Sequence, residues 1–210
     1  MSAGESARAE YERRRANDEA RIHAAWGRFG KIAVALTPEK QTTRAWAVGA
    51  EGEERVGARL DQLAGDSIRV LHDRRIPGTR ANIDHIVVTA ACVWVIDTKR
   101  YSGDAPEKRV EGGWIRPRVE RLWARGDKTK LVDSVWWQME KIEEAIGSVP
   151  IRGALCFIDA NWGLLPSAFT VNDVLVTWPR DLAKRIGSGA ESDLDVNAVA
   201  AALESRFRAR

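Results

Sequence analysis

The sequence has few of the residues on which secreted and zinc-binding proteins depend. It contains two cysteines, Cys92 and Cys156, each inside an apolar run typical of a strand. We therefore expect a reduced, buried pair, with a disulfide as the alternative. The three histidines, His23, His72 and His85, have none of the spacings typical of zinc ligands, so the sequence does not indicate a zinc site.

Long apolar segments are also missing. The longest early apolar run, residues 32–36, is far shorter than the ~20 residues that a membrane-spanning helix needs. The polar N-terminus has no apolar segment of the kind found in secretory signals. The sequence also has no internal repeat and no low-complexity tract. These observations predict a cytoplasmic protein that does not interact with a membrane.

What the sequence does contain is the balanced mixture of a globular protein. Hydrophobic residues make up 44% and charged residues 30% of the 210 residues, which suits one compact domain with an appendage. The net charge of +3 permits a nucleic-acid partner without requiring one. Nine tryptophans are scattered from Trp26 to Trp178, and we expect most of them in the core or in a groove wall, with base stacking as the alternative.

Dense charge marks the N-terminal segment. Residues 5–25 are helix formers with almost no apolar stripe, so they predict a solvated helical appendage that is dispensable for the fold. The alternative is that its arginine cluster, residues 13–15, contacts phosphate groups. Residues 27–45 contain glycine, proline and threonine and are interpreted as a linker. We therefore divide the chain into an appendage with its linker, residues 1–45, and a domain with a C-terminal helical tail, residues 46–210.

The domain has the mixed helix and strand pattern of an α/β protein. Apolar residues at a helical period predict helices at residues 52–63 and 129–146, of which the second is strongly amphipathic. Runs rich in valine and isoleucine between turn residues predict strands. The expected strands are residues 68–76, 81–89, 92–98, 151–158 and 173–177, with a weaker one at 114–119 after a polar connection at 102–113, and two C-terminal helices are expected at 179–186 and 192–208.

The second and third expected strands bring two carboxylates together if they form a hairpin. With Ala90 and Ala91 as the loop, the numbers of paired residues have a constant sum, and Asp84 falls opposite Asp97. Opposed side chains lie ~5 Å apart at Cβ, where like charges are destabilising. Because both strands are otherwise apolar, such a pair needs a shared proton or a cation. A hard divalent ion, Mg²⁺ or Mn²⁺, bound by carboxylate oxygens resolves the conflict.

A lysine completes the pattern on the third strand. Asp97 and Lys99 are two residues apart, so in a strand they share one face. An acid that holds a metal and an ammonium group that steers water and offsets negative charge suit phosphodiester hydrolysis. The alternative is an ordinary ion pair at a strand end, which the predicted position of Asp84 opposite Asp97 disfavours.

Two side chains on helices are further candidates. Glu53 lies on the apolar stripe of Val56 and Leu60, so its carboxylate is predicted to point toward the core side of its helix. The alternative for Glu53 is an interaction with the dipole at the helix N-terminus. Gln138 shares a face with Val135 in the later helix, where it could orient phosphate or water or be a satisfied core residue.

Three neighbours of the acids are harder to assign. His85 alternates onto the strand face opposite to that of Asp84, where we expect it to pack against a helix. Arg100 and Tyr101 end the strand beside the predicted site. Contact with phosphate and plain surface exposure are both consistent with their positions.

Three short segments contain these candidate residues in a characteristic order. They are GAEGE at residues 49–53, NIDH at 82–85, and VIDTKRY at 95–101 followed by Gly103. Through them, residues 46–158 resemble the nuclease-related domain (NERD) family, a branch of the restriction-endonuclease-like PD-(D/E)xK superfamily. The order and spacing of the three segments, rather than any one of them, make the resemblance specific.

The resemblance implies a restriction-endonuclease-like mixed β-sheet flanked by helices. It also implies that Asp84 and Asp97 are metal-binding acids, that Lys99 is the catalytic lysine and that Glu53 is an acid carried by a helix. Gln138 matches a glutamine on a later helix of some relatives. Asp97 stands where many members of the family have glutamate.

Together these features predict a Mg²⁺- or Mn²⁺-dependent nuclease that hydrolyses phosphodiester bonds in DNA, in processing, repair or defence. Its catalytic residues would be Glu53, Asp84, Asp97, Lys99 and Gln138, with the three acids as metal ligands. A rival hypothesis is a catalytically silent nucleic-acid-binding or scaffold module with the same fold. A third is an interaction domain that forms a homo-oligomer through its charged N-terminal helix.

Overall fold

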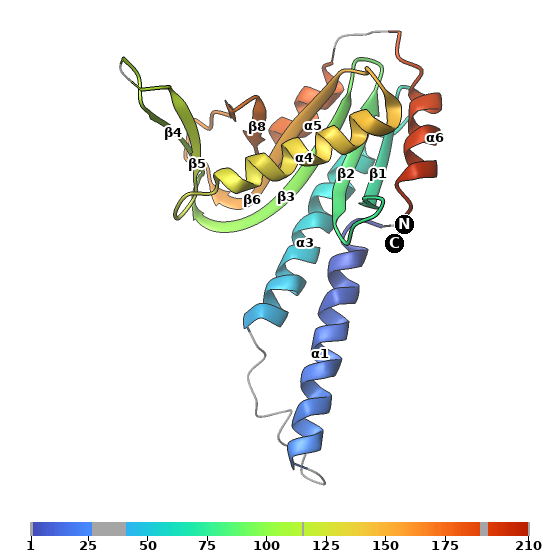
Figure 1. Cartoon of the computed structure of the whole chain (residues 1–210), viewed down its shortest axis with the longest axis vertical. Helices are drawn as coiled ribbons and strands as arrows, with labels where there is room; N and C mark the ends of the chain where they lie inside the picture. The colour runs from blue at the N-terminus through green and yellow to red at the C-terminus, as the bar shows by residue number, and fades with distance from the viewer. Residues whose placement is uncertain (1, 27–40, 115, 190–192, 210) are drawn as a thin grey trace.

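A mixed six-stranded sheet forms the centre of this computed structural model, which describes residues 2–26, 41–114, 116–189 and 193–209 (Figure 1). In spatial order its strands are β1 (Ile68–Arg75), β2 (Asn82–Thr89), β3 (Val93–Asp104), β6 (Ile151–Asn161), β8 (Val174–Thr177) and β7 (Phe169–Val171). Neighbouring strands run antiparallel from β1 to β3 and parallel from β3 through β6 to β8. β7 pairs antiparallel with β8 at the far edge.

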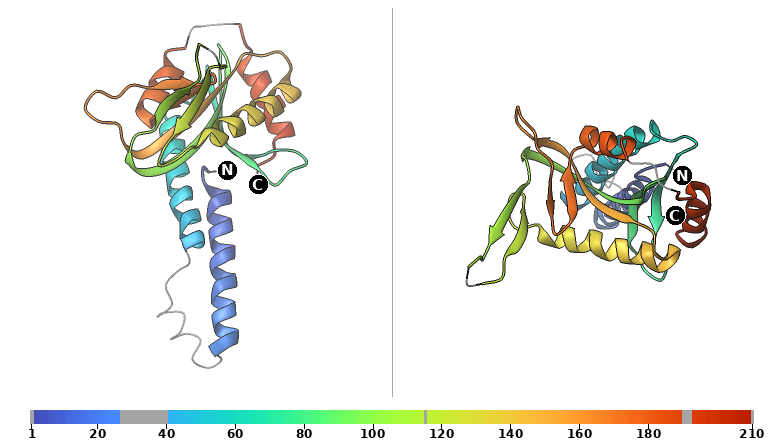
Figure 2. Two further views of the ribbon diagram at one scale, coloured as in Figure 1. Left: turned by 60° about the vertical axis from the view of Figure 1, so that its left-hand side comes forward. Right: turned by 90° about the horizontal axis from the view of Figure 1, so that it is seen from above.

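Helices cover both faces of this sheet (Figure 2). Those in the described part of the chain are α1 (Glu5–Trp26), α3 (Gln41–Asp61), α4 (Thr129–Ile146), α5 (Pro179–Gly187) and α6 (Val196–Arg206). α4 and α6 pack on one face, in a core that includes Val95, whereas α3 and α5 pack on the other, in a core that includes Ile96. None of these described helices is both long enough and apolar enough to cross a lipid bilayer. The predicted α/β class is confirmed, and the mixed sheet flanked by helices is consistent with a restriction-endonuclease-like fold.

The hairpin of β2 and β3 has the register that the sequence predicts. The pairs of residues that join the two strands follow the constant sum expected from a two-residue loop. At that loop the Thr89 N–H donates to the Cys92 carbonyl oxygen at 3.0 Å, and the Thr89 hydroxyl oxygen accepts the Cys92 N–H at 3.1 Å. A threonine side chain therefore closes the turn without a glycine. The same count of residues places Asp84 opposite Asp97.

The helix before the sheet is longer than the sequence predicts. We expected it at residues 52–63, but α3 begins at Gln41. Threonine and glycine lower the helix propensity of its first half, yet α1 packs along it in an antiparallel hairpin (Figure 1). Tertiary packing outweighs local propensity here, so the boundary that we expected between residues 45 and 46 falls inside α3. The linker predicted at residues 27–45 lies, up to residue 40, outside the described residues.

The first turns of α1 pack against the domain. Asp73 lies in β1 but has no partner in the register that pairs β1 with β2, and its φ is positive, at 50°. Its carboxylate accepts the Ser6 N–H at 2.5 Å and also the Ser6 hydroxyl, while Asn82 Nδ2 donates to it at 2.8 Å. Ala3 and Ala7 are buried. This end of the helix therefore differs from the solvated appendage that its charge predicted, because a buried carboxylate caps it from the sheet.

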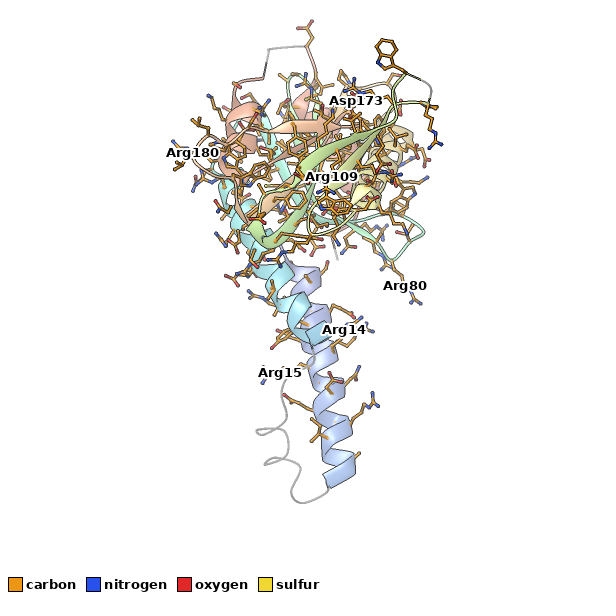
Figure 3. All side chains as sticks on the ribbon, turned by 90° about the vertical axis from the view of Figure 1, so that its left-hand side faces the viewer. Arg14, Arg15, Arg80, Arg109, Asp173 and Arg180 are labelled. Atoms are coloured by element: carbon orange, nitrogen blue, oxygen red, sulfur yellow. The ribbon has the colours of Figure 1, made fainter. Side chains whose placement is uncertain are left out.

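The arginine cluster of α1 is occupied by acids of the same helix. Arg13 and Arg14 pair with Glu10 at 2.5 and 2.7 Å, and Arg15 pairs with Glu19 at 2.9 Å. The arm formed by α1 and α3 carries Arg14 and Arg15 away from the sheet (Figure 3). The cluster is therefore poorly placed to contact a phosphate group bound at the sheet.

A two-stranded ribbon projects from the domain between β3 and α4 (Figures 1 and 2). Its strands, β4 (Glu107–Glu111) and β5 (Val119–Trp123), pair antiparallel. The sequence predicted a polar connection followed by a strand at residues 114–119 instead. That prediction was wrong because the ribbon has little apolar alternation, and its pairing depends on cross-strand ion pairs such as Lys108–Glu120 at 2.5 Å.

Candidate active site

Two carboxylates meet on the sheet face that α4 covers. Asp97 is 5% exposed, and Asp84, across the hairpin, accepts the Thr98 N–H at 2.8 Å. The Asp97 carboxylate acts electrostatically on the Asp84 carboxyl group. Burial, and then the charge of Asp97, raises the pKa of Asp84 to about 7. The structure thus brings together the two acids that the sequence placed opposite each other.

Lys99 places its ammonium group on the Asp97 carboxylate. Lys99 Nζ forms an ion pair with Asp97 Oδ1 and lies 3.4 Å from the Thr98 carbonyl oxygen. Burial alone would lower the pKa of Lys99, but the negative charges of Asp97 and Asp84 outweigh it and raise that pKa. The ammonium group therefore stays charged. Because 26% of the side chain is exposed, a ligand can reach it from solvent.

Glu53 faces the same group of charges from α3. Val56 and Leu60 are buried, so the predicted core-facing stripe of this helix is confirmed. Burial, followed by the charges of Asp84 and Asp73, raises the pKa of Glu53 to about 9. Because α3 begins at residue 41, Glu53 lies well inside the helix, which excludes an interaction with the dipole at its N-terminus.

The donor atoms suit a hard divalent ion. Within the described parts of the chain, no three His, Cys, Asp or Glu side chains are close enough together to hold one ion, so Glu53 does not complete a three-ligand site with the two aspartates. Two neighbouring carboxylates are nevertheless sufficient for Mg²⁺, which keeps several waters and is commonly bound by one or two carboxylates and a substrate phosphate. The raised pKa of Asp84 supports this fit, because a cation beside the two acids relieves their repulsion.

An ion-pair network holds α3 against the ends of β3 and β6. Arg100 pairs with Asp159 at 2.7 Å and with Glu51 at 2.6 Å. Arg55 of α3 pairs with the same Asp159 at 2.8 Å. The Arg100 guanidinium is thus occupied by two carboxylates, and it positions the helix that carries Glu53 rather than offering a free contact for phosphate.

The structure favours a functional role for Gln138 and a packing role for Tyr101. Gln138 is buried on α4, and its Oε1 has no hydrogen-bond partner among the residues that the structure describes. A satisfied core glutamine would have such a partner, so the oxygen remains available to accept a hydrogen bond from water. Tyr101 packs edge-on against Phe157, with 5.4 Å between the ring centroids. Packing therefore accounts for Tyr101 without a contact to phosphate.

A chain of polar groups, three of them buried, lies behind the acids and was not predicted from the sequence. His85 Nε2 and Thr98 Oγ1 are 3.1 Å apart, and His85 Nδ1 lies 2.9 Å from His72 Nδ1. His72 Nε2 lies 2.8 Å from Asp61 Oδ1. Burial, followed by the neighbouring His72, lowers the pKa of His85 to about 3, so its ring is neutral. The Thr98 N–H also donates to Asp84. The chain therefore holds in place the residue that follows Asp97 and contacts Asp84.

The direction of each hydrogen bond in this chain is set by which ring nitrogens of His72 and His85 carry a proton. Where His72 donates to the Asp61 carboxylate from Nε2 alone, its Nδ1 accepts from His85 Nδ1, and His85 Nε2 accepts the hydroxyl proton of Thr98. His72 lies opposite His85 across β1 and β2, but the loop at residues 76–81 is too long to reveal that register from sequence.

In chelator, Asp84→Asn should raise the melting temperature at pH 8. The native carboxyl keeps a proton that the unfolded chain releases, so stability falls as pH rises from the ordinary pKa of 3.8 to about 7. Asparagine removes the charge and still accepts the Thr98 N–H. A gain of about 1–2 kcal/mol corresponds to roughly 2–8 °C for a chain of this size.

Thermal unfolding at pH 8 and pH 4.5 measures this effect. The gain should nearly vanish at pH 4.5, where Asp84 is protonated in the native protein. A melting temperature at pH 8 equal to that of the wild type would show that the two carboxylates do not repel each other.

The same residues are matched by a known protein family. A scan against protein-family models matches the nuclease-related domain over residues 48–158, more than half of the 210-residue chain. The chain belongs to the nuclease-related domain family. Its NERD domain includes Glu53, Asp84, Asp97, Lys99 and Gln138, as well as the hairpin that joins the two aspartates. No curated protein and no solved structure matches the chain.

Membership in the NERD family indicates a nuclease-like function, with nucleic acid as the substrate class. The PD-(D/E)xK superfamily is consistent with this family and with the mixed sheet. Domains of this kind generally use divalent metal ions. The all-oxygen donor set of Asp84 and Asp97 agrees with that chemistry.

Proposed function

We propose that this NERD domain is a Mg²⁺- or Mn²⁺-dependent nuclease that hydrolyses phosphodiester bonds in DNA. The observation that supports it best is the arrangement of Asp84, Asp97 and Lys99 on one face of two paired strands. Asp84 and Asp97 would hold the ion, and Glu53 would face it from α3, where the charge of a bound cation would favour the ionised form of this carboxyl group. We further propose that the enzyme acts in the cytoplasm, in DNA processing, repair or defence.

Lys99 would act on the phosphate group. In the free protein its ammonium is held by Asp97, at the edge of the buried acids. When a phosphodiester approaches, the same ammonium is placed to contact a phosphate oxygen and to stabilise the negative charge that develops in the transition state. A bound divalent ion would supply further positive charge at the phosphate and lower the pKa of a water molecule.

Gln138 would orient water. Its buried Oε1 lacks a hydrogen-bond partner in the described structure and can accept a proton of a water molecule. This role needs only that α4 hold the side chain still, and α4 is fixed by the buried residues Val135 and Ile142 on either side of Gln138. A water molecule that Gln138 holds in position before the substrate binds loses less entropy when it reacts.

The test is metal binding and cleavage measured on the same variants. Asp84→Asn and Asp97→Asn should each nearly abolish Mn²⁺ binding in a calorimetric titration, because even an outer partner of a metal ligand commonly contributes 10–100-fold to affinity. Both variants should also fail to cut linear, nicked and branched DNA that the wild type cuts with Mg²⁺ or Mn²⁺. Asp133→Asn, which alters an exposed acid of α4, is the matched control and should leave both properties unchanged.

Two results would contradict the proposal. Normal Mn²⁺ affinity in either aspartate variant would remove that residue from the metal site. A wild-type protein that binds DNA but cuts none of these substrates in either metal would favour the catalytically silent binding module.

A further inference from the structure

The tip of the β4–β5 ribbon has a surface unlike the rest of the molecule. Residues 112–118 contain two arginines and no acid. Trp114 is fully exposed, although most tryptophans in folded proteins are largely buried. Arg116 and Arg118 are exposed, and in the part of the chain that the structure describes neither side chain has a hydrogen bond or an ion pair. The tip therefore presents an aromatic ring and two unpaired positive charges to solvent.

The stem of the ribbon, by contrast, is electrically neutralised. Figure 3 shows Arg109 on this stem, and its guanidinium lies 3.7 Å from the centroid of the Trp123 ring. Each cation of the two strands is held by at least one carboxylate. The pairs are Lys108–Glu120 (2.5 Å), Arg109–Glu107 (2.5 Å), Arg121–Glu111 (2.7 Å) and Arg121–Asp127 (3.0 Å).

The conformation of the tip is defined by its backbone. Gly112 and Gly113 have positive φ values of 81° and 147°, which other residues rarely adopt. The Gly113 N–H donates to the Arg116 carbonyl oxygen at 2.9 Å, and a Cβ on Gly112 would collide with the carbonyl oxygen of Pro117. A tip shaped before binding loses little conformational entropy when it meets a partner.

These features match double-stranded DNA as a ligand. A two-stranded β-ribbon fits the major groove, which is ~12 Å wide. Arginines without carboxylate partners can neutralise phosphates without first breaking an ion pair. A protruding apolar side chain can contact the thymine methyl groups inside this groove. A protein partner would be expected to need a broader apolar surface, whereas the tip combines one exposed ring with two arginines that form no ion pair, with Glu120 within electrostatic range of Arg118.

We propose that the tip of the β4–β5 ribbon binds double-stranded DNA, with Arg116 and Arg118 on phosphates and Trp114 inside the groove. β3, which carries Asp97 and Lys99, leads into β4 through residues 105–106, so one continuous segment joins the acids to the ribbon. The inference rests on the proposed function and specifies how its substrate is held.

The experiment is equilibrium binding of a fluorescent DNA duplex to the full chain in chelator, measured by anisotropy at several salt concentrations. Arg116→Ala/Arg118→Ala should weaken binding at least tenfold and lower the slope of log K against log salt by about 2, because each phosphate contact contributes ~0.9 to the slope. Trp114→Ala should weaken binding severalfold and leave the slope unchanged, because an uncharged side chain contacts bases without neutralising a phosphate. Arg80→Ala/Arg180→Ala removes the same charge elsewhere (Figure 3) and should bind as the wild type does.

Several outcomes would overturn the inference. If the double arginine variant kept the wild-type affinity and slope, the ribbon tip would not bind DNA, and a protein partner would be favoured instead. Equal losses in the Arg80→Ala/Arg180→Ala control would show that only net charge matters. Because chelator prevents metal-dependent cleavage, the result is independent of activity. A chain that binds through the tip but cuts nothing refutes the proposed function alone, whereas one that cuts DNA but binds normally without the tip refutes this inference alone.

Discussion

Lys99→Ala should lower the rate of DNA cleavage by ~10²–10³-fold, the usual effect of removing one electrostatic group that acts in the transition state. The ammonium lies on Asp97, so it is within reach of any phosphate bound beside that carboxylate. Lys99→Arg should restore little activity, because a planar guanidinium cannot replace a compact ammonium at a fixed distance. Single-turnover rates at saturating Mg²⁺ or Mn²⁺ measure the effect on the chemical step.

A matched control separates this effect from a general loss of charge. Lys130→Ala removes an exposed lysine from the start of α4 and should leave the rate unchanged. Mn²⁺ binding should survive in Lys99→Ala, because both carboxylates remain. Cleavage by Lys99→Ala at the wild-type rate would exclude Lys99 from catalysis, and loss of Mn²⁺ binding would assign it a structural role instead.

The part of the site that could be predicted is the part that a short loop controls. The two-residue loop of Ala90 and Ala91, closed by the hydrogen bond between Thr89 and Cys92, leaves one register, so Asp84 and Asp97 could be placed opposite each other by counting. Strand alternation then put Lys99 on the face of Asp97. The long helices α1 and α4 and the strand β2 were likewise predicted nearly to the residue, because their composition or apolar period is strong, whereas β3 and β6 extend six and three residues beyond their predicted ends.

The rest depends on contacts between segments far apart in the sequence. The pairing of His72 with His85 needs a register that a long loop does not fix, and the cap on α1 needs Asp73 to lie beside Ser6. The first half of α3 packs along α1, a contact between segments that the local sequence does not reveal. The ribbon was missed because charged pairs hold it together, and charged pairs leave no apolar period to detect.

Deletion of residues 1–40 should lower the melting temperature by about 6–12 °C. From the sequence alone this segment is expected to be dispensable, but its removal leaves the buried Asp73 carboxylate without the Ser6 N–H and hydroxyl. Breaking a buried charged contact costs about 3 kcal/mol or more, and 1 kcal/mol shifts the midpoint by about 2–4 °C for a chain of this size. Thermal unfolding followed by circular dichroism is the measurement.

The cause of that loss can be isolated with Asp73→Asn. Asparagine tolerates the positive φ of this position but accepts fewer hydrogen bonds, so the full-length variant should lose only about 1–2 kcal/mol. In the shortened chain the same substitution should be neutral or stabilising, because it removes a charge that has lost two of its three hydrogen-bond donors and keeps only Asn82. A shortened chain that melts at the wild-type temperature would show that α1 is an appendage after all.

The hydrogen-bonded chain behind the acids restricts how this sequence can change over evolutionary time. Each ring nitrogen of His72 and His85 is hydrogen-bonded to the next group in this chain, so a replacement of one histidine leaves the other ring with an unmatched buried nitrogen. Substitutions at positions 61, 72, 85 and 98 are therefore epistatic. All four residues can be replaced together by apolar residues, whereas single replacements pass through destabilised intermediates. Either change would also remove the support of Thr98, the residue whose N–H binds Asp84.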